Sequence, residues 1–176
     1  MDKLAITVQK PHNLAFIDGQ NLYSGTRDGG WAVDHIKFRT YLREKYDIHE
    51  AYYFLGVATD TERDLYDRLE KARFTLSFRE HALGQRAQKK GNVDSDIIFS
   101  IMKKLVVNEV IGKIFIVSGD GDYKKLVDFL VERDCFGKML FPNGKYESSL
   151  FFSLGTECYD YLDGEDIKAK IIYSHK

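Results

Sequence analysis

Short apolar runs alternate along this chain with longer stretches whose apolar residues recur at helical spacing. The clearest run covers residues 114–117 and ends at the small residues Ser118 and Gly119. A run of this length, bounded by turn residues, is typical of a buried β-strand. Beyond the turn, apolar residues recur three and four positions apart from Tyr123 to Val131, which predicts a helix. The stretch is therefore expected to form one half of a βαβ unit.

The same alternation recurs over most of the 176 residues. We expect strands at residues 14–17, 51–57, 74–78, 114–118, 136–141 and 158–162. We expect helices at residues 34–46, 59–73, 93–107 and 123–133, with a short one at 148–154. Residues 24–33 are rich in glycine and are expected to form a loop, and residues 81–92 a loop or a small hairpin. Strands alternating with helices predict an α/β fold, a three-layer α/β/α arrangement around a mostly parallel central sheet.

Two of the expected helices begin at capping signals. An N-cap side chain accepts hydrogen bonds from N–H groups that the first helical turn leaves without partners. Asp34 is placed to cap the helix that ends near Tyr46. Thr59, followed by Glu62, has the spacing of a capping box.

The composition indicates a folded domain, because 44% of the residues are hydrophobic and 14% are aromatic. The net charge of -1 provides no overall basic field, so binding of nucleic acid would need a local basic patch or a metal ion. Two cysteines, Cys135 and Cys158, with no secretory leader before the first strand, predict a cytoplasmic protein with reduced thiols. No apolar run is long enough to span a membrane, so a membrane partner is not expected, while a homodimer is left open.

Four aspartates are expected to meet at one edge of the sheet. Asp18 follows the first strand, and Asp120 and Asp122 follow the fourth. If these strands are neighbours, their carboxyl ends form the crevice in which open α/β sheets bind ligands. Asp94 extends the apolar stripe of its helix by one turn, and because that stripe faces the sheet, Asp94 should point toward the strand ends. Asp96 lies on another face of the same turn, at the rim.

Carboxylates gathered in one crevice repel, and they stay ionised together only if a cation joins them. Ligands that are all oxygen suit Mg²⁺ or Mn²⁺ rather than zinc. Such an ion binds phosphate oxygens, and two of them would favour hydrolysis of a phosphodiester. Each residue also has a simpler role open to it: Asp94 and Asp122 could be helix caps, and Asp18 and Asp120 could stabilise their own turns. The joint placement of three separate segments favours the metal site.

Three motifs occur in the order found in a known family. They are Phe16-Ile17-Asp18-Gly19-Gln20-Asn21-Leu22, Lys90-Gly91-Asn92-Val93-Asp94 and Ser118-Gly119-Asp120-Gly121-Asp122-Tyr123. These motifs resemble the NYN domain family, LabA-like branch, of the PIN-like nuclease superfamily. Here Asn92 adds one residue to the commonest family spacing. The resemblance covers residues 12–163 and leaves residues 1–11 as an N-terminal lead-in and residues 164–176 as a C-terminal tail.

The resemblance implies a PIN-like, Rossmann-like fold and a metal-dependent ribonuclease that hydrolyses RNA phosphodiester bonds with Mg²⁺ or Mn²⁺. By matching position, it implies the catalytic and metal-binding residues Asp18, Asp94, Asp120 and Asp122. It implies that the amide of Asn21 orients Asp18, a water or the phosphate, that Ser118 orients Asp120 or contacts the phosphate, and that Asp96 is accessory. Lys90 is the candidate to bind a substrate phosphate, because the neighbouring Gly91 allows close approach. The alternative is a non-catalytic RNA-binding or regulatory scaffold of the same fold.

Basic and aromatic residues near the expected crevice are candidates for contacts with RNA. Five basic residues precede Asp94 in one loop: Arg79, His81, Arg86, Lys89 and Lys90. Lys124 and Lys145 follow strand ends and could border the crevice. Tyr23 and Trp31 could stack on a base, although packing is the more common role of the tryptophan. A phosphatase or a Toprim-like enzyme fits less well. A phosphatase with a nucleophilic aspartate requires Asp-x-Asp after the first strand, and a Toprim-like enzyme requires Glu there. This chain has Asp18-Gly19-Gln20 at that place.

Overall fold

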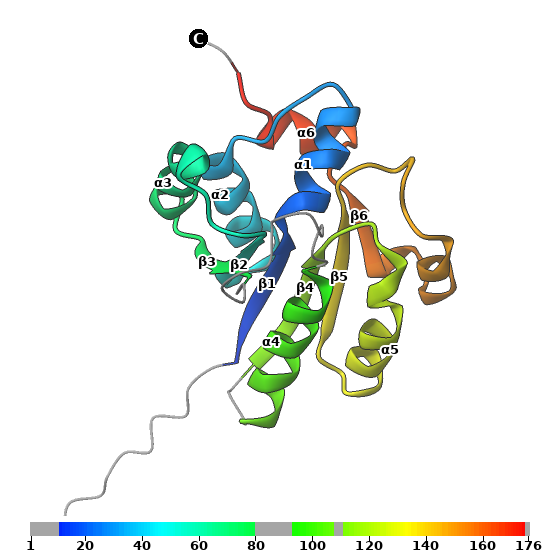
Figure 1. The fold of residues 1–176 in the computed structure, drawn as a ribbon. Helices are drawn as coiled ribbons and strands as arrows, with labels where there is room; N and C mark the ends of the chain where they lie inside the picture. Colours follow the sequence, from blue (N-terminus) through cyan, green and yellow to red (C-terminus); the bar gives the residue numbers. More distant parts are fainter. Residues whose placement is uncertain (1–10, 80–92, 108–110, 175–176) are drawn as a thin grey trace, which may run out of the picture.

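The computed structural model describes residues 11–79, 93–107 and 111–174, and six strands form a single sheet (Figure 1). The strands are β1 (His12–Asp18), β2 (Ile48–Leu55), β3 (Thr75–Phe78), β4 (Ile111–Val117), β5 (Phe136–Phe141) and β6 (Tyr159–Tyr161). They lie in the order β3-β2-β1-β4-β5-β6, and each neighbouring pair is parallel. The predicted α/β fold with a parallel central sheet is confirmed. The strand order reverses between β1 and β4, which is where open α/β sheets bind ligands.

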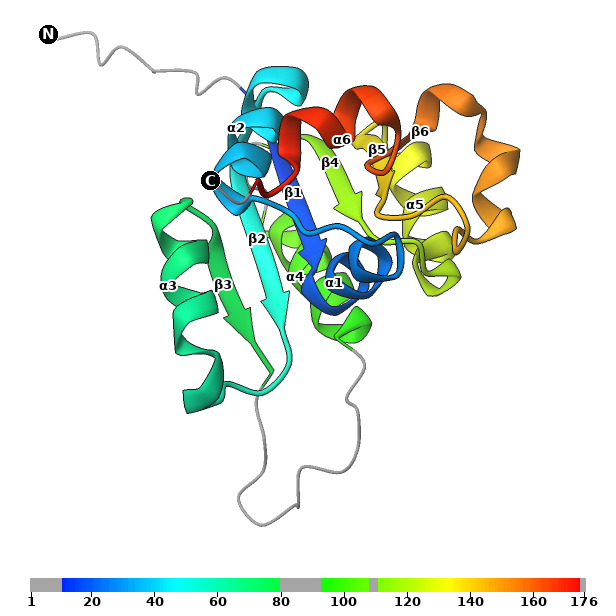
Figure 2. The same cartoon turned by 90° about the horizontal axis from the view of Figure 1, so that it is seen from above.

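Helices cover both faces of the sheet because successive side chains of a strand point to opposite sides (Figure 2). Ala15 and Ile17 of β1 belong to one buried layer, and Leu14 and Phe16 belong to the other. The first layer is covered by α1 (Gly19–Asp28), α2 (His35–Tyr46), α3 (Arg63–Lys71) and α6 (Glu165–Ile171). The second is covered by α4 (Asp94–Val106) and α5 (Lys124–Glu132). The central strands are thus buried on both sides, as their continuous apolar runs indicated.

The prediction of a glycine-rich loop at residues 24–33 was wrong for the first half of this range, because α1 continues to Asp28. The helix begins directly after β1, and Asp18, the last residue of the strand, caps it by accepting a hydrogen bond from the N–H of Asn21. Gly25 is buried and serves close packing: a Cβ atom at this position would lie 2.7 Å from the Cβ of Pro142. Glycine content therefore indicated a close approach of two segments here and not a loop.

The other elements follow the predictions more closely. Asp34 caps α2 as expected, since its carboxylate accepts hydrogen bonds from the N–H groups of Ile36 and Lys37. The helix expected from residue 59 begins as a 3₁₀ turn, η1 (Asp60–Glu62), without a side-chain cap, and continues as α3. The short helix after β5 is the 3₁₀ segment η3 (Ser149–Leu154), and a second 3₁₀ turn, η4 (Thr156–Cys158), precedes β6. Strand β2 begins three residues earlier than residue 51.

Residues after β6 take part in the core. Helix α6 packs against α2, and its last residue, Ile171, is fully buried in the layer that also holds Trp31. Ile172 forms an antiparallel bridge with Val33. The segment that sequence analysis assigned to a tail therefore contributes a packed helix.

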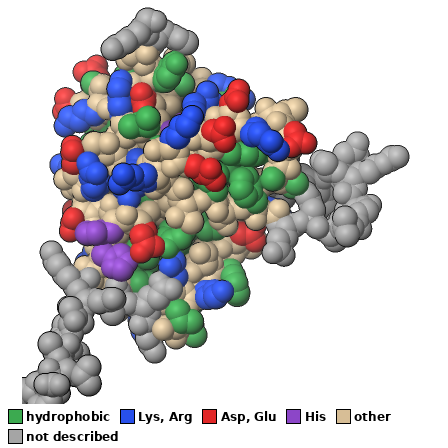
Figure 3. Space-filling view, turned by 90° about the vertical axis from the view of Figure 1, so that its left-hand side faces the viewer, with side chains coloured by type: hydrophobic (Ala, Val, Ile, Leu, Met, Phe, Trp, Pro, Cys, Tyr) green, Lys and Arg blue, Asp and Glu red, His purple; other side chains and the backbone are tan. Residues whose placement is uncertain are grey.

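Basic and acidic side chains are interspersed on the side of the molecule that lies at the left of Figure 1 (Figure 3). This distribution agrees with the net charge of -1 for the whole chain. Among the helices in the described ranges, none combines the length and the apolar character needed to cross a bilayer.

We predict that the stability of the fold depends on the charge state of His35. The ring of His35 packs edge-on against Tyr53, and burial lowers the pKa of His35 to about 4, with the charge of Arg68 adding to the effect. Because the unfolded chain then binds the proton more readily, the free energy of unfolding should fall as the pH falls from about 6.5 to about 4. The loss should reach about 3 kcal/mol by pH 4.

Chemical denaturation at a series of pH values measures this dependence. A His35→Phe variant keeps the ring contact and should lose this part of the pH dependence. The matched control is His49→Phe, because His49 is exposed. Equal slopes for the His35→Phe variant and the unsubstituted protein would contradict the prediction.

Candidate metal centre at the carboxyl ends of β1 and β4

The ends of β1 and β4 lie side by side, which places the residues that follow them at one edge of the sheet. The two strands pair in parallel, with Ile17 opposite Val117. Asp18 and Ser118 are the next residues, and both are buried. The expected convergence of the first and fourth strands is therefore present in the structure.

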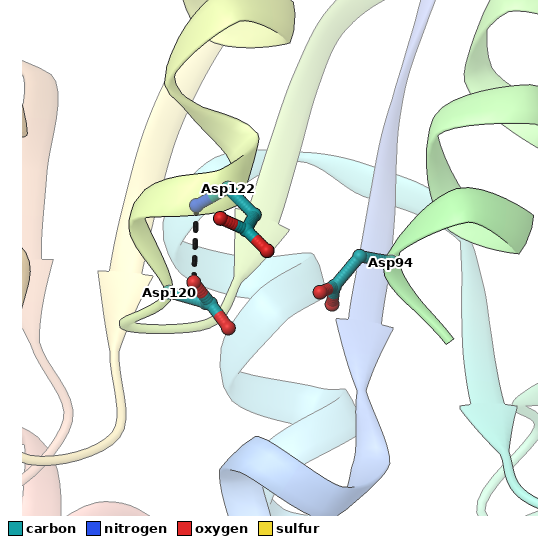
Figure 4. A group of neighbouring side chains, drawn as sticks. All are labelled: Asp94, Asp120 and Asp122. Carbon is teal, nitrogen blue, oxygen red and sulfur yellow. Dashed lines mark hydrogen bonds between the residues drawn. The ribbon is translucent and has the colours of Figure 1, made fainter. Parts of the chain in front are cut away.

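Three aspartates form a cluster beyond these strand ends. Asp94 projects from the first turn of α4 toward Asp120 and Asp122, which lie in the segment after β4 (Figure 4). Each of the three carboxylates has an oxygen within 4.8 Å of the others. Asp94 is buried, Asp120 is partly buried and Asp122 is exposed. The cluster is therefore enclosed by protein at Asp94 and open to solvent at Asp122.

The donor set of this cluster fits a hard divalent cation. Mg²⁺ takes oxygen ligands at about 2.0–2.1 Å, so two oxygens on opposite sides of the ion lie about 4 Å apart. The ligand oxygens of the cluster all lie within 4.8 Å of one another. In an octahedral site, positions that the three carboxylates leave open toward solvent would be filled by water or by phosphate oxygens. Three close aspartates could thus hold a divalent ion.

The segment after β4 is held in place by hydrogen bonds to its own backbone. The hydroxyl of Ser118 accepts a hydrogen bond from the N–H of Asp120 at 3.1 Å. The carboxylate of Asp120 in turn accepts one from the N–H of Asp122 at 3.0 Å and so caps the 3₁₀ turn η2 (Gly121–Tyr123). Asp120 therefore has a structural role in its loop in addition to its place in the cluster.

Asn21 joins the two strand ends. Its backbone N–H donates to the carboxylate of Asp18, and its side-chain oxygen accepts a hydrogen bond from the N–H of Gly119, each at 2.9 Å. Asn21 was expected to orient Asp18, a water or the phosphate through its amide. In the structure the backbone N–H orients Asp18, and the side chain instead fixes the segment that leads to Asp120.

Asp18 lies close to the cluster but is not one of the three carboxylates that share the 4.8 Å separation. It is 5% exposed, and its Oδ2 atom lies 3.5 Å from the hydroxyl of Tyr123. Burial raises the pKa of Asp18 to about 6, and the negative charges of Asp94 and Asp120 add to the rise, while the hydrogen bond from Asn21 opposes it. The raised pKa thus reflects burial first and repulsion between carboxylates second, and a bound cation would oppose both by favouring the ionised form.

Tyr123 is the site residue that sequence analysis missed. It was counted among the apolar residues of the helix after β4, and it is indeed fully buried. Its hydroxyl donates a hydrogen bond to Asp94 at 2.6 Å. Burial and the charge of Asp18 raise the pKa of Tyr123, so the hydroxyl stays neutral and can donate. A buried tyrosine usually needs a partner for its hydroxyl, and that rule pointed to a polar neighbour within the core.

Helix capping was the alternative role predicted for Asp94 and Asp122, but other aspartates perform it. Asp18 caps α1 and Asp120 caps η2. Asp94 is the first residue of α4, which has no side-chain cap, and Asp122 lies within η2. Capping therefore does not account for the positions of Asp94 and Asp122.

The remaining candidates lie around the cluster or outside it. Asp96 is half-buried on the first turn of α4 and is not a member of the cluster. Lys124 pairs with Asp128, one turn further along its own helix, and Lys145 is exposed. Trp31 is 7% exposed and packs in the core, whereas Tyr23 is 58% exposed. His81, Arg86, Lys89 and Lys90, the last of which was predicted to contact substrate, lie outside the described residues.

We predict that the Tyr123 hydroxyl stabilises the metal-free protein. Tyr123→Phe removes the donor to Asp94 and leaves a buried carboxylate with one hydrogen bond fewer. The free energy of unfolding should fall by roughly 1.5–3 kcal/mol, as is usual for hydrogen bonds to charged groups. Denaturation with urea in the presence of a chelator measures the change. Tyr23→Phe at an exposed site is the control, and equal stability of the two variants would contradict the prediction.

We also predict that the cluster binds Mn²⁺ and that Asp94 is needed for it. Mn²⁺ at about 100 times its dissociation constant should stabilise the folded protein by about 2.7 kcal/mol. In Asp94→Asn this stabilisation should disappear. The metal-free stability should be unchanged or higher, because one repelling charge is gone while the amide oxygen still accepts from Tyr123.

Thermal unfolding with and without Mn²⁺, together with titration calorimetry, checks both parts. The control is Asp134→Asn, because Asp134 is an exposed aspartate paired with Lys113. If Asp94→Asn were stabilised by Mn²⁺ as much as this control, the cluster would not be the binding site.

Comparisons with known proteins identify the family of this chain and support its fold. The chain is 26% identical over 131 residues to "Low amplitude and bright protein LabA" of Synechococcus elongatus, covering 69% of each protein. A crystal structure of a protein of unknown function from Vibrio parahaemolyticus matches with a TM-score of 0.72 at 17% identity, covering 95% of this chain and 99% of that one, which shows a shared fold. Residues 14–151, well over half of the chain, match the NYN domain. This protein therefore belongs to the NYN domain family, as its three sequence motifs indicated.

Proposed function

We propose that this protein is a metal-dependent ribonuclease that hydrolyses phosphodiester bonds of RNA at the aspartate cluster. One observation supports the proposal above all. Asp94, Asp120 and Asp122 converge within 4.8 Å at the reversal point of the strand order, in a chain that belongs to the NYN domain family. The family suggests a PIN-like nuclease, and the cluster supplies the ligand chemistry that such an enzyme needs.

Each carboxylate has a role that follows from its burial. Asp94, Asp120 and Asp122 would hold Mg²⁺ or Mn²⁺, with Asp122 on the solvent side where a substrate arrives. Asp18, buried at the rear, would add negative charge and serve as a further ligand or as a partner of the ligands. A bound ion would accept a phosphate oxygen, lower the pKa of the attacking water and stabilise the leaving oxygen.

The positioning residues act on the backbone and not on the substrate. Ser118 fixes the N–H of Asp120, and Asn21 fixes both Asp18 and Gly119. We assign them to preorganising the carboxylates, so that the ligands need little rearrangement when an ion and a phosphate bind. Asp96 and Lys90 keep their proposed roles as accessory and substrate-binding residues.

RNA binding should depend on the ion. With a net charge of -1, and with carboxylates lining the site, the metal-free centre repels phosphate. A scaffold that only binds RNA would have no use for such repulsion, which argues against the non-catalytic alternative. Both cysteines are free thiols, which supports the proposed cytoplasmic location. A homodimer stays a prediction.

We predict that the purified protein cuts single-stranded RNA in Mn²⁺ or Mg²⁺ and that Asp120→Asn abolishes the cutting. Asparagine keeps the capping oxygen of residue 120 but removes the charge. The rate should fall by more than about 100-fold, because even the outer partners of metal ligands are worth about 10- to 100-fold. Gel analysis of a labelled RNA gives the rates, with a chelator as the blank.

The control for this experiment is Asp128→Asn, which removes an acidic residue of α5 that pairs with Lys124. Both variants are purified in the same way, so a contaminating ribonuclease would leave equal activity in each. Equal cutting by the two variants would remove the proposal. Binding of RNA without cutting in either metal would instead support the scaffold.

A further inference from the structure

A hollow of about 120 Å³ lies beside the acidic cluster. One wall is a single face of α1, to which Asn21, Ser24 and Asp28 contribute at positions three, four and seven apart. The opposite wall is the turn after β5, which contributes Asn143 and Tyr146. We call this hollow the α1 groove.

The α1 groove and the aspartate cluster share a wall. Gly119 lines the groove and directly precedes Asp120, and its N–H donates to the side chain of Asn21, which also lines the groove. Asn21 is in turn hydrogen-bonded to Asp18. A nucleic-acid strand whose phosphate lies at the carboxylates would therefore place a neighbouring nucleotide at this groove.

The chemistry of the α1 groove suits a nucleoside and not a phosphate. Its lining offers an aromatic ring, Tyr146, and the side-chain oxygens of Ser24 and Asp28, while Lys and Arg are absent from its described lining. The Ser24 hydroxyl already accepts from Gln20, and Oδ1 of Asp28 accepts from Arg27, which leaves Oδ2 of Asp28 as the acceptor for a ligand. Small-molecule pockets usually measure about 300–1,000 Å³. A hollow of about 120 Å³ therefore has room for one ring system only.

Hydrogen bonds anchor the turn that bears Tyr146. Asn143 is 5% exposed; its side-chain nitrogen donates to the carbonyl of Gly25 at 3.0 Å, and its side-chain oxygen accepts from the N–H of Lys145 at 2.9 Å. The N–H of Tyr146 donates to the carbonyl of Asn143. Tyr146 nevertheless is 62% exposed, so a well-anchored turn presents an open ring. Such preorganisation reduces the entropy that a stacking partner must lose.

We propose that the α1 groove binds one unpaired ribonucleoside next to the scissile phosphate, with its base on Tyr146 and its ribose hydroxyl donating to Asp28. The inference rests on the proposed function and assigns to it a subsite for one base beside the metal centre. Bases that are not paired can be splayed out and stacked on aromatic side chains, and the 2′-hydroxyl is what distinguishes RNA from DNA. Paired bases have no free face for Tyr146.

Binding of a labelled single-stranded oligoribonucleotide, measured by fluorescence anisotropy with Mn²⁺ in an Asp120→Asn background, tests the inference without cleavage. Adding Tyr146→Ala should weaken binding roughly 5- to 150-fold, the usual range for loss of a stacked base. Tyr146→Phe keeps the ring and should bind as the background does. The matched control is Tyr173→Ala, because Tyr173 is 50% exposed and does not line the groove.

Two further measurements test whether the groove requires unpaired RNA and whether it recognises the ribose. Duplex RNA should bind the Tyr146→Ala protein as well as it binds the background protein. Asp28→Ala should lower the ratio of RNA affinity to DNA affinity, for one sequence, by about tenfold, as expected for a hydrogen bond to a charged group. Unchanged binding in Tyr146→Ala, an equal loss in Tyr173→Ala, or an equal loss for duplex RNA would overturn the inference.

The binding measurements test the groove and the cleavage assay tests the nuclease proposal, so either proposal can be contradicted while the other stands. If the protein does not cut RNA but Tyr146→Ala still weakens binding, the nuclease proposal falls and the groove stands. If the protein cuts RNA and Tyr146→Ala changes neither binding nor the Michaelis constant, the groove assignment falls and the nuclease stands.

Discussion

The organisation of this molecule around its site depends on repulsion between carboxylates that the fold brings together. Parallel pairing of β1 and β4 places Asp18 beside the segment that bears Asp120, and the first turn of α4 adds Asp94. The surroundings offset only part of the repulsion. The Tyr123 hydroxyl and the Asn21 N–H are neutral donors, and the pKa of Asp18 remains raised to about 6, by burial first and by the neighbouring charges second. A divalent cation would offset the remaining repulsion.

Much of this arrangement could be predicted from sequence because it follows from strand ends. Apolar runs located the strands, and the rule that parallel strands present their carboxyl ends at one edge brought Asp18 and Asp120 together. The helical stripe of α4 was enough to aim Asp94 inward, since Asp94 continues the face that holds Ile97 and Ile101 in the core. These inferences succeeded because they depended only on the periodicity of apolar residues and on the rule that parallel strands present their carboxyl ends at one edge of the sheet.

What could not be predicted depended on contacts between segments distant in the sequence. Gly25 suggested a loop because its value for close packing against Pro142 becomes visible only in three dimensions. Tyr123 looked like a core residue, and it is one, but its hydroxyl finds Asp94 from 29 positions away along the chain. The link from Asn21 to Gly119 likewise spans 98 positions, and local sequence has no signal for it.

The caps on α1 and η2 affect how relatives of this protein should be interpreted. Asp18 and Asp120 each close a helical turn as well as standing at the acidic centre, so selection for folding alone would retain them. Asp94 caps no helix, but its carboxylate accepts a hydrogen bond from the buried Tyr123 hydroxyl, so it too has a structural duty. Asp122 is exposed and caps no helix in the described structure. In a descendant that had given up chemistry, Asp122 would therefore drift first, and its retention is the better marker of a working enzyme.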